Sequence, residues 1–175
     1  MATERAGDVR QVGREALAYA DTLHNLAHYL AGNDPDAQDL VQETYARALR
    51  SLHQFTPGTN LKAWLCRILR NTFVSEYRRR RGSPVVGGLD TVDPVPDVAD
   101  HEIDALRKVM ADEIEAALMR LGEDARTVIL LDLEGLTEVE VAEVMGCAVG
   151  TVKSRLSRAR ASLRRLIGDA AGERG

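Results

Sequence analysis

The sequence contains few cysteines and few aromatic residues, and these shortages exclude several classes of protein. Its 175 residues include only 2 cysteines and 1 tryptophan, and aromatic side chains make up 4%. Cys66 and Cys147 lie in apolar helical sequence and belong to no CxxC pair, so we expect reduced, buried thiols rather than a disulfide or a metal site. A chain with so few aromatic residues, and with clustered glycines and prolines, does not favour a large β-rich core.

Long apolar runs are missing as well. No stretch approaches the roughly 20 apolar residues of a membrane-spanning helix. The opening residues, MATERAGDVRQVGRE, also lack the apolar segment of a secretion signal. We therefore expect a cytosolic protein with no membrane segment of its own.

Signals for enzymatic chemistry are equally scarce. No glycine-rich phosphate loop and no Ser/His/Asp signature stand out. His24 and His28 are four residues apart on one predicted helix and could share a metal, but no third ligand follows nearby. The sequence thus predicts a protein that acts by binding, without a metal or another cofactor.

Charge is distributed unevenly along the chain. The formal net charge is −4, yet residues 1–81 carry +3, residues 82–136 carry −9 and residues 137–175 carry +2. An acidic protein of this kind can still present two basic surfaces, separated by an acidic middle.

The segment LTEVEVAEVMGCAVGTVKSRLSRARASLRRL, residues 136–166, predicts two helices joined by a tight turn. Thr137 and Glu140 form a capping box, and Gly146 suits the left-handed end of the first helix. The second helix, from about residue 150, has an apolar stripe through Val152, Leu156, Ala159, Leu163 and Leu166. Its other faces carry no acid and six basic residues: Lys153, Arg155, Arg158, Arg160, Arg164 and Arg165.

A solvated basic face is the simplest interpretation of such a helix. The glycine turn, the absence of acids and the small polar residues near the helix start favour a DNA-binding helix-turn-helix instead. Thr151, Ser154 and Ser157 lie at the end that a recognition helix inserts into the major groove.

The N-terminal part predicts three amphipathic helices. The first spans residues 15–30. Asp34 and Pro35 predict the start of the second, whose apolar stripe reaches Leu49 and Leu52. Its outer face carries Asp39, Gln42 and Glu43, which periodicity alone assigns to solvent.

Asn60 predicts the start of the third helix, after the turn-rich residues 55–60. Trp64 falls on its apolar stripe, which favours a core position over base stacking. The helix ends in the run Arg78–Arg81, which suits both the helix dipole and phosphate binding.

Residues 82–101 contain Gly, Pro and Asp without helical periodicity and predict a flexible acidic linker. Helices then return near residues 102–121 and 125–133, the first with apolar positions at Val109, Met110, Ile114, Leu118 and Leu121. The sequence predicts an all-α protein with two small helical domains, 13–81 and 102–168, and a frayed end from Gly168.

Taken together, these segments resemble the extracytoplasmic-function (ECF) sigma factors of the sigma-70 family. NDPDAQDLVQETYARALRSL resembles sigma region 2.2, FTPGTNLKAWLCRILRNTFVSEYRRRR resembles regions 2.3 and 2.4, and EGLTEVEVAEVMGCAVGTVKSRLSRARASLRRL resembles region 4.2. The resemblance covers residues 13–168. One departure is Leu121-Gly-Glu-Asp-Ala125, where the family usually has a Leu-Pro-Pro turn, so the start of the following helix stays open.

The resemblance implies a role for each segment. Asp39, Gln42 and Glu43 would bind the clamp helices of the RNA polymerase β′ subunit, and region 4 would contact the β flap. The −10 promoter element would be opened and held by Phe55, Asn60, Lys62, Trp64, Arg67, Arg70, Asn71, Arg78, Arg79 and Arg80. The −35 element would be bound by Thr151, Lys153, Ser154, Arg155, Ser157 and Arg158.

The family also implies partners and control. Core RNA polymerase and promoter DNA would be the partners, and an anti-sigma factor would hold the protein inactive until a stress or another signal arrives. Two alternatives remain open at this point: a stand-alone helix-turn-helix regulator, and a sensor or enzyme based on a metal or a thiol.

Overall fold

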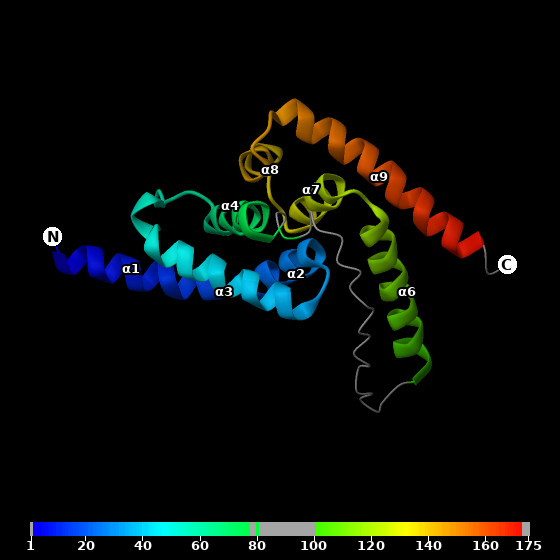
Figure 1. Cartoon of the computed structure of the whole chain (residues 1–175), viewed down its shortest axis with the longest axis horizontal. Coiled ribbons are helices and arrows are strands. Elements are labelled where there is room, and N and C mark those ends of the chain that lie inside the picture. Colours follow the sequence, from blue (N-terminus) through cyan, green and yellow to red (C-terminus); the bar gives the residue numbers. More distant parts are fainter. Residues whose placement is uncertain (1, 78–79, 81–100, 173–175) are drawn as a thin grey trace.

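The structure, a computed structural model, describes residues 2–77, 80 and 101–172, and this part contains helices and no strand (Figure 1). The prediction of an all-α fold is confirmed. The α-helices are α1 (Ala2–Leu17), α2 (Ala20–Ala31), α3 (Asp34–Arg50), α4 (Leu61–Thr72), α6 (His101–Arg120), α7 (Glu123–Leu133), α8 (Glu138–Met145) and α9 (Val149–Gly172). A 3-10 turn, η1 (Leu52–Gln54), and a π-helical turn, η2 (Phe73–Tyr77), complete the list.

The described chain has two halves, the first from α1 to η2 and the second from α6 to α9. The first half begins with a helix that periodicity did not predict. The expected helix from Glu15 is in fact the end of α1 followed by α2, separated by a turn at residues 18–19. The weak apolar pattern of residues 2–14 explains why α1 was missed. Gly32 ends α2 with a left-handed φ of 79°.

Helix α3 is capped by Asn33 rather than by Asp34, which corrects the prediction. The Asn33 side chain accepts a hydrogen bond from the Asp36 backbone N–H (2.9 Å), and Pro35 lies in the first turn as expected. The buried face consists of Ala37, Leu40, Thr44 and Ala48. Leu49 was predicted on the apolar stripe but is 62% exposed, because it lies at the edge of that face.

Helix α4 starts where the sequence predicted. The Asn60 side chain accepts from the Ala63 backbone N–H (3.3 Å), and Leu65, Cys66 and Leu69 are fully buried. Burying each leucine contributes roughly 1.5–3 kcal/mol. The helix, which was predicted to end in the run Arg78–Arg81, changes to a π-helical turn after Thr72.

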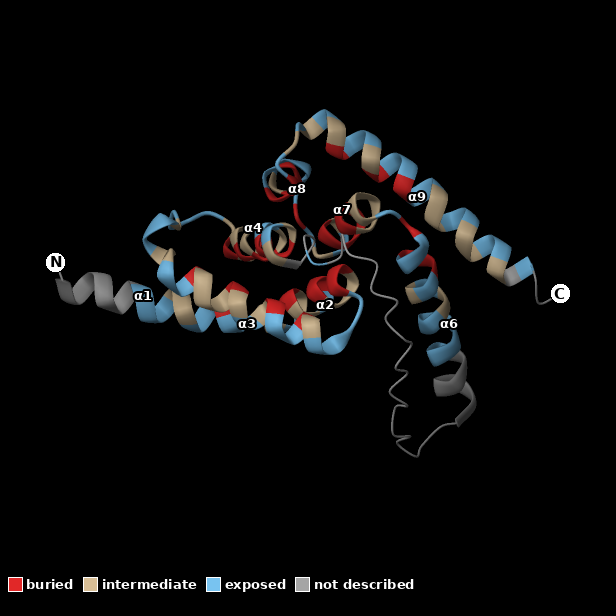
Figure 2. Ribbon diagram, viewed as in Figure 1, coloured by how far each residue is buried: buried red, intermediate tan, exposed pale blue. Residues whose placement is uncertain are grey.

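Helix α6 extends away from the rest of the molecule, and its C-terminal end packs against α9 (Figures 1 and 2). Leu118 and Leu121 are buried, whereas Val109, Met110 and Ile114 are 43–54% exposed. The apolar stripe that the sequence shows in this helix is therefore buried at its C-terminal end and exposed in its middle. A stripe shows which face of a helix is apolar, but it does not show that a neighbour covers that face.

Helices α8 and α9 form the predicted helix-turn-helix, and α7 packs against both. Both bonds of the capping box are present, with Thr137 N donating to Glu140 Oε2 (2.8 Å) and Glu140 N donating to Thr137 Oγ1 (3.3 Å). Gly146 has a φ of 64°, which favours glycine at this position. Helix α9 continues to Gly172, so the expected fraying from Gly168 was wrong within the described residues.

The two halves pack directly against each other. Helix α4 lies against α8 and α2 lies against α7, and buried residues of both halves belong to one apolar cluster (Figure 2). The sequence predicted two domains on a tether but gave no sign of this contact. The acidic linker, predicted over residues 82–101, lies outside the described residues up to residue 100, and His101 begins α6.

Candidate nucleic-acid interface

The residues predicted to bind the −35 element lie on the N-terminal part of α9. Val152, Leu156 and Ala159 are at most 3% exposed and fix this helix against α7 and α8. The intervening side chains therefore point outward. Of the predicted −35 residues, the exposed ones are Lys153, Ser154, Ser157 and Arg158, and the half-buried ones are Thr151 and Arg155.

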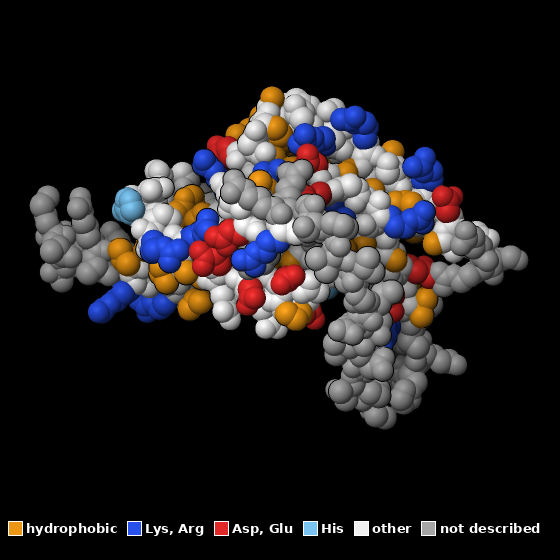
Figure 3. All heavy atoms as spheres, in the orientation of Figure 1, with side chains coloured by type: hydrophobic (Ala, Val, Ile, Leu, Met, Phe, Trp, Pro, Cys, Tyr) orange, Lys and Arg blue, Asp and Glu red, His pale blue; other side chains and the backbone are white. Residues whose placement is uncertain are grey.

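Several cations of α9 have acidic partners within the second half. Lys153 Nζ lies 3.5 Å from Glu138 Oε2, and both side chains are largely exposed. Arg160 donates to Asp132 (2.6 Å) further along the helix. Basic side chains nevertheless line the outer edge of the molecule over α9 (Figure 3). The surface is exposed and basic, as a recognition helix requires.

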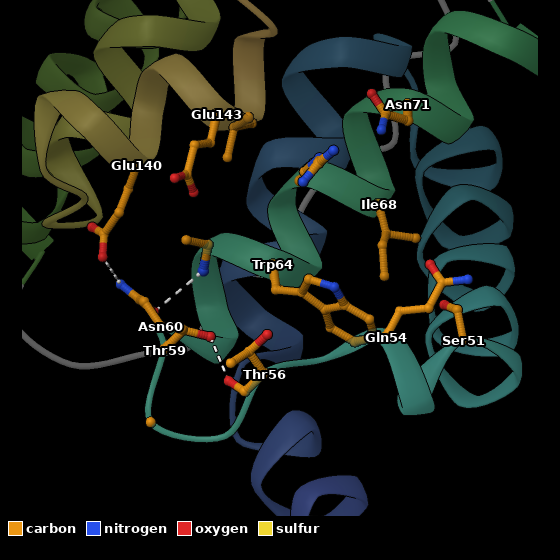
Figure 4. Close-up of a pocket in the computed structure, with 14 residues that line it drawn as sticks. Ser51, Gln54, Thr56, Thr59, Asn60, Trp64, Ile68, Asn71, Glu140 and Glu143 are labelled. Carbon is orange, nitrogen blue, oxygen red and sulfur yellow. Dashed lines mark hydrogen bonds between the residues drawn. The ribbon is translucent and has the colours of Figure 1, made fainter. Parts of the chain in front are cut away.

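Several residues predicted to bind the −10 element surround a pocket of about 650 Å³ between residues 51–60, α4 and α8 (Figure 4). Trp64 is half-buried and packs on Phe55, with the ring centroids 5.3 Å apart at 55°. Trp64 thus serves as core and as part of the pocket wall. Arg67 and Asn71 are exposed and also line the pocket.

Three predicted −10 residues are bonded to the second half. Asn60 Nδ2 donates to Glu140 Oε1 (3.1 Å), and the Lys62 ammonium donates to the backbone carbonyl of Glu134. The third, Arg70, has Nη2 at 3.6 Å from an oxygen of the Asp124 carboxylate and is only 15% exposed. Of the terminal arginines, Arg80 is exposed, while Arg78 and Arg79 lie outside the described residues.

The face predicted to bind polymerase lies on α3. Asp39 and Gln42 are exposed, whereas Glu43 is half-buried within a group of charges. Arg47 Nε donates to Glu43 Oε1 (2.8 Å), and Arg50 lies 3.3 Å from the same oxygen. The hydrogen bond from Arg47 holds the pKa of Glu43 below its ordinary value, so this carboxylate remains charged. Glu43 is therefore not the freely solvated acid that the sequence suggested.

His28, Cys66 and Cys147 lie outside the residue sets predicted to bind DNA or polymerase. His28 Nδ1 lies 3.1 Å from Asp34 Oδ1, and its Nε2 lies 2.9 Å from Glu115 Oε1, so the ring connects α2, α3 and α6. Cys66 is buried, and burial raises its pKa to about 12. Cys147 is half-exposed, which corrects the prediction that both thiols are buried.

Within the described residues we find no cluster of three His, Cys, Asp or Glu side chains suited to a metal. Nor do the described helices include one with the length and apolar character needed to cross a bilayer.

Sequence reasoning missed the acids that face the residues predicted to bind the −10 element. Glu134, Asp124 and Glu143 carried no recognisable signal, and Glu140 was noticed only as a capping residue. Asp124, Glu140 and Glu143 lie on outer faces of short helices, and Glu134 follows the end of α7. Their opposition to α4 arises from the packing of the two halves, which local sequence does not encode.

Comparison with known proteins agrees with this architecture. The family models "Sigma-70 region 2" and "Sigma-70, region 4" match residues 16–83 and 111–163. The chain is 41% identical to the ECF RNA polymerase sigma factor EcfG of Rhodopseudomonas palustris, over 87% of this chain and 83% of that protein. It is 38% identical to the ECF RNA polymerase sigma factor SigE of Mycolicibacterium smegmatis, over 83% of this chain and 57% of that protein.

Two solved structures share the fold. One is the sigma factor RpoE in complex with the anti-sigma factor NepR from Bartonella quintana, with a TM-score of 0.71 and 34% identity over 89% of this chain and 95% of that chain. The other is CnrH in complex with the cytosolic domain of CnrY, with a TM-score of 0.67 and 28% identity over 96% of this chain and 94% of that chain. The chain therefore belongs to the ECF RNA polymerase sigma factors.

Proposed function

We propose that this protein directs core RNA polymerase to a specific set of promoters by holding the DNA at two points. The observation that carries this proposal is the pairing, in one chain, of an exposed basic recognition helix with a pocket that is walled by Trp64, Arg67 and Asn71 of α4. One surface suits duplex DNA in the major groove, and the other suits an unpaired strand with an unstacked base.

At the −35 element, the exposed side chains at the start of α9 would read base edges. Lys153 and Arg158 have the donors for guanine, and Ser154 and Ser157 can bond to several bases. Arg155 is half-buried and paired with Asp124, so we assign it to the phosphate backbone or to helix positioning.

At the −10 element, the pocket beside Trp64 would hold a flipped base while surrounding cations hold the strand. Asn60, Arg67 and Asn71 line this pocket, and Phe55 supports the indole ring. Lys62 and Arg70 lie on the same helix and would contact phosphates. We extend this role to the arginines from Arg78 to Arg80 on their charge alone.

The exposed Asp39 and Gln42, with Glu43 beside them, would bind the clamp helices of the β′ subunit, and the second half would contact the β flap. This activity needs binding only, so we propose a non-enzymatic factor that acts in the bacterial cytoplasm. The similar sigma factor RpoE was crystallised with the anti-sigma factor NepR, and the similar structure of CnrH was solved with the cytosolic domain of CnrY. We propose the same type of control here, with release in response to a signal.

Transcript mapping tests the proposal. Core polymerase would be incubated with genomic DNA in the presence and absence of the purified chain, and transcript starts would be sequenced. We expect a discrete set of starts that requires the chain and shares a −35 and a −10 motif. Tight operator binding without polymerase, and no new starts, would favour a stand-alone regulator.

A further inference from the structure

A small cavity lies within the first half, between α1, α3 and α4, and has a volume of about 290 Å³. Apart from Arg10, Arg14, Tyr45 and Trp64, most of the residues that line it are leucines and the others are alanine and glycine. The Tyr45 hydroxyl already donates to the backbone carbonyl of Ala16 (2.8 Å). The walls therefore offer mainly apolar surface to an occupant.

The rim of the cavity combines apolar and basic side chains. Leu17 and Leu49 line the cavity and are nevertheless 63% and 62% exposed. Arg10 and Arg14 are also exposed, and their spacing of four residues places them on one face of α1. Arg14 Nε donates to the Arg10 backbone carbonyl (3.4 Å), and among the side chains that the structure describes no carboxylate forms an ion pair with either arginine. Two cations without an acidic partner among those side chains therefore lie beside an apolar cavity.

The size, apolar lining and charge of the cavity together define which ligand fits it. Ligand pockets usually have about 300–1,000 Å³, so a cavity at the lower limit of this range suits a small molecule. Apolar walls favour an aliphatic chain over a polar ligand, because they offer a polar group no hydrogen bond in exchange for water. The two guanidinium groups favour a carboxylate head, which arginine can bind through two parallel N–H donors.

We propose that this cavity binds a small amphiphilic anion, a straight aliphatic chain with a terminal carboxylate. The chain lies between α1, α3 and α4, and the carboxylate lies at Arg10 and Arg14. Trp64 lines this cavity and also the pocket assigned to the −10 element, where Figure 4 shows it. The occupant therefore contacts a side chain that both sites share. Binding to the isolated chain does not depend on the proposed function, so the two can fail separately.

The test titrates octanoate, below the concentration at which it forms micelles, into the full chain. Trp64 is the only tryptophan of the sequence, so intrinsic fluorescence reports directly on the wall of the cavity. We expect a saturable change with one site per chain. The Tm should rise, because a ligand that binds only the folded state stabilises it. Hexanoate lacks two CH₂ groups and should bind about tenfold more weakly, and 1-octanol, which lacks the charge, should also bind more weakly.

Gly13→Leu tests the location of the chain. Gly13 lines the cavity within α1, and a Cβ placed on it meets no atom within 4 Å, so a larger side chain fits there. Gly13→Ala is the matched control, because both substitutions raise helix propensity but only leucine fills the cavity. We expect Gly13→Leu to weaken octanoate binding at least tenfold and Gly13→Ala to bind as the wild type does.

The combined variant Arg10→Gln and Arg14→Gln tests the position of the carboxylate. Both arginines are exposed, so the fold should be retained even if Gly13→Leu fails to fold. We expect octanoate to bind about tenfold more weakly and 1-octanol to bind with unchanged affinity. Arg164→Gln combined with Arg165→Gln removes the same charge from exposed positions on α9 and is the matched control.

Four results would each overturn the proposal. They are a fluorescence change that is absent or does not saturate, a lower Tm in octanoate, equal affinity for octanoate of Gly13→Leu and Gly13→Ala, and equal affinity of the two arginine variants. A lower Tm would identify octanoate as a denaturing surfactant, which binds the unfolded chain rather than a cavity of the folded one.

Discussion

The residues proposed to bind the −35 element and those proposed to bind the −10 element differ in how far other side chains of this sigma factor cover them. The start of α9 projects Lys153, Ser157 and Arg158 into solvent, with Lys153 held only by a neighbouring acid of its own half. On α4, by contrast, Lys62 and Arg70 are bonded across the interface to the other half. The surface expected to read duplex DNA is open, and the surface expected to hold an unpaired strand is covered.

This difference suits the order of events at a promoter. Duplex −35 DNA is present before any melting, so its reader can be exposed at all times. The −10 strand is unpaired only after the promoter has been melted, and a basic channel left open would bind other single strands without selectivity. Covering the channel therefore protects specificity. The following predictions test this contrast, from the largest expected effect to the smallest.

Leu156→Ala should destabilise the helix-turn-helix that carries the exposed residues of α9. Leu156 is 3% exposed and holds α9 against the rest of the helix-turn-helix. The loss of its buried side chain should lower the free energy of unfolding by about 2–5 kcal/mol, measured by urea denaturation. Leu163→Ala, at a half-buried position further along α9, is the control and should cost less. An equal loss in both variants would contradict this account of the packing.

Lys153→Ala and Arg158→Ala should each weaken binding of the holoenzyme to its promoter. If they contact base edges, each should cost about 1–3 kcal/mol and relax the preference at one −35 position. Promoter libraries randomised at −35 would measure both effects. Arg165→Ala removes an exposed charge further along α9 and should leave the sequence preference unchanged.

Asp39→Lys should weaken binding to core polymerase by about tenfold, since it reverses an exposed charge on the docking face. Asp39 is a cleaner probe than Glu43, because a lysine at 43 would face Arg47 and Arg50 and disturb α3 itself. Fluorescence anisotropy with labelled chain would measure the affinity. Asp21→Lys, an exposed acid on α2, is the matched control; unchanged affinity for Asp39→Lys would refute the assigned face.

Lys62→Ala should show a smaller net effect on promoter binding than Arg158→Ala. The substitution removes one phosphate contact but also removes one contact that closes the −10 surface. These two consequences have opposite signs, so we expect a net loss below about 1 kcal/mol. A loss as large as that of Arg158→Ala would mean that Lys62 is not held in the free protein.

His28 should make the packing of the two halves depend on pH. Burial alone would lower the pKa of His28, but the hydrogen bonds and charges of Glu115 and Asp34 outweigh it and raise the pKa above the ordinary 6.5. The rings of His28 and Tyr29 also lie edge to face, with their centroids 5.4 Å apart. Because the folded pKa is the higher one, the stabilisation is full below the unfolded pKa and is lost as pH rises through the folded pKa.

The expected contribution of His28 is about 0.2–1 kcal/mol, as for partly exposed ion pairs. The difference in unfolding free energy between the wild type and His28→Gln should therefore shrink as pH rises from about 6 to 8.5. His24→Gln, on the same helix, is the control. A difference that grows with pH would contradict the assignment.

The sequence predicted local features better than the contact between the halves. Asn60 and the Thr137–Glu140 capping box are short-range devices, and both occur as predicted. Leu49 was misplaced because its position at the end of a stripe does not reveal whether a neighbour covers it. Asn33 was overlooked because Asp34 and Pro35 offered an equally good helix start.

The sequence predicted which residues make up the candidate site, but it did not predict which of them are covered by the other half of the chain. Exposure of Lys153 and Arg158 follows from the apolar stripe of α9, which the sequence displays fully. Lys62 and Glu134 are 72 positions apart in the sequence, and tertiary packing brings them into contact. No periodicity within one helix carries that information.

The most direct test of a two-point grip is footprinting of the reconstituted holoenzyme on a promoter found by transcript mapping. Permanganate reactivity reports unpaired thymines near −10, and nuclease protection reports contact at −35. We predict that Lys62→Ala combined with Arg70→Ala removes the unpaired thymines but keeps −35 protection, while Arg158→Ala weakens −35 protection. If the combined variant opened the −10 region as well as the wild type does, the assignment of strand binding to α4 would be contradicted.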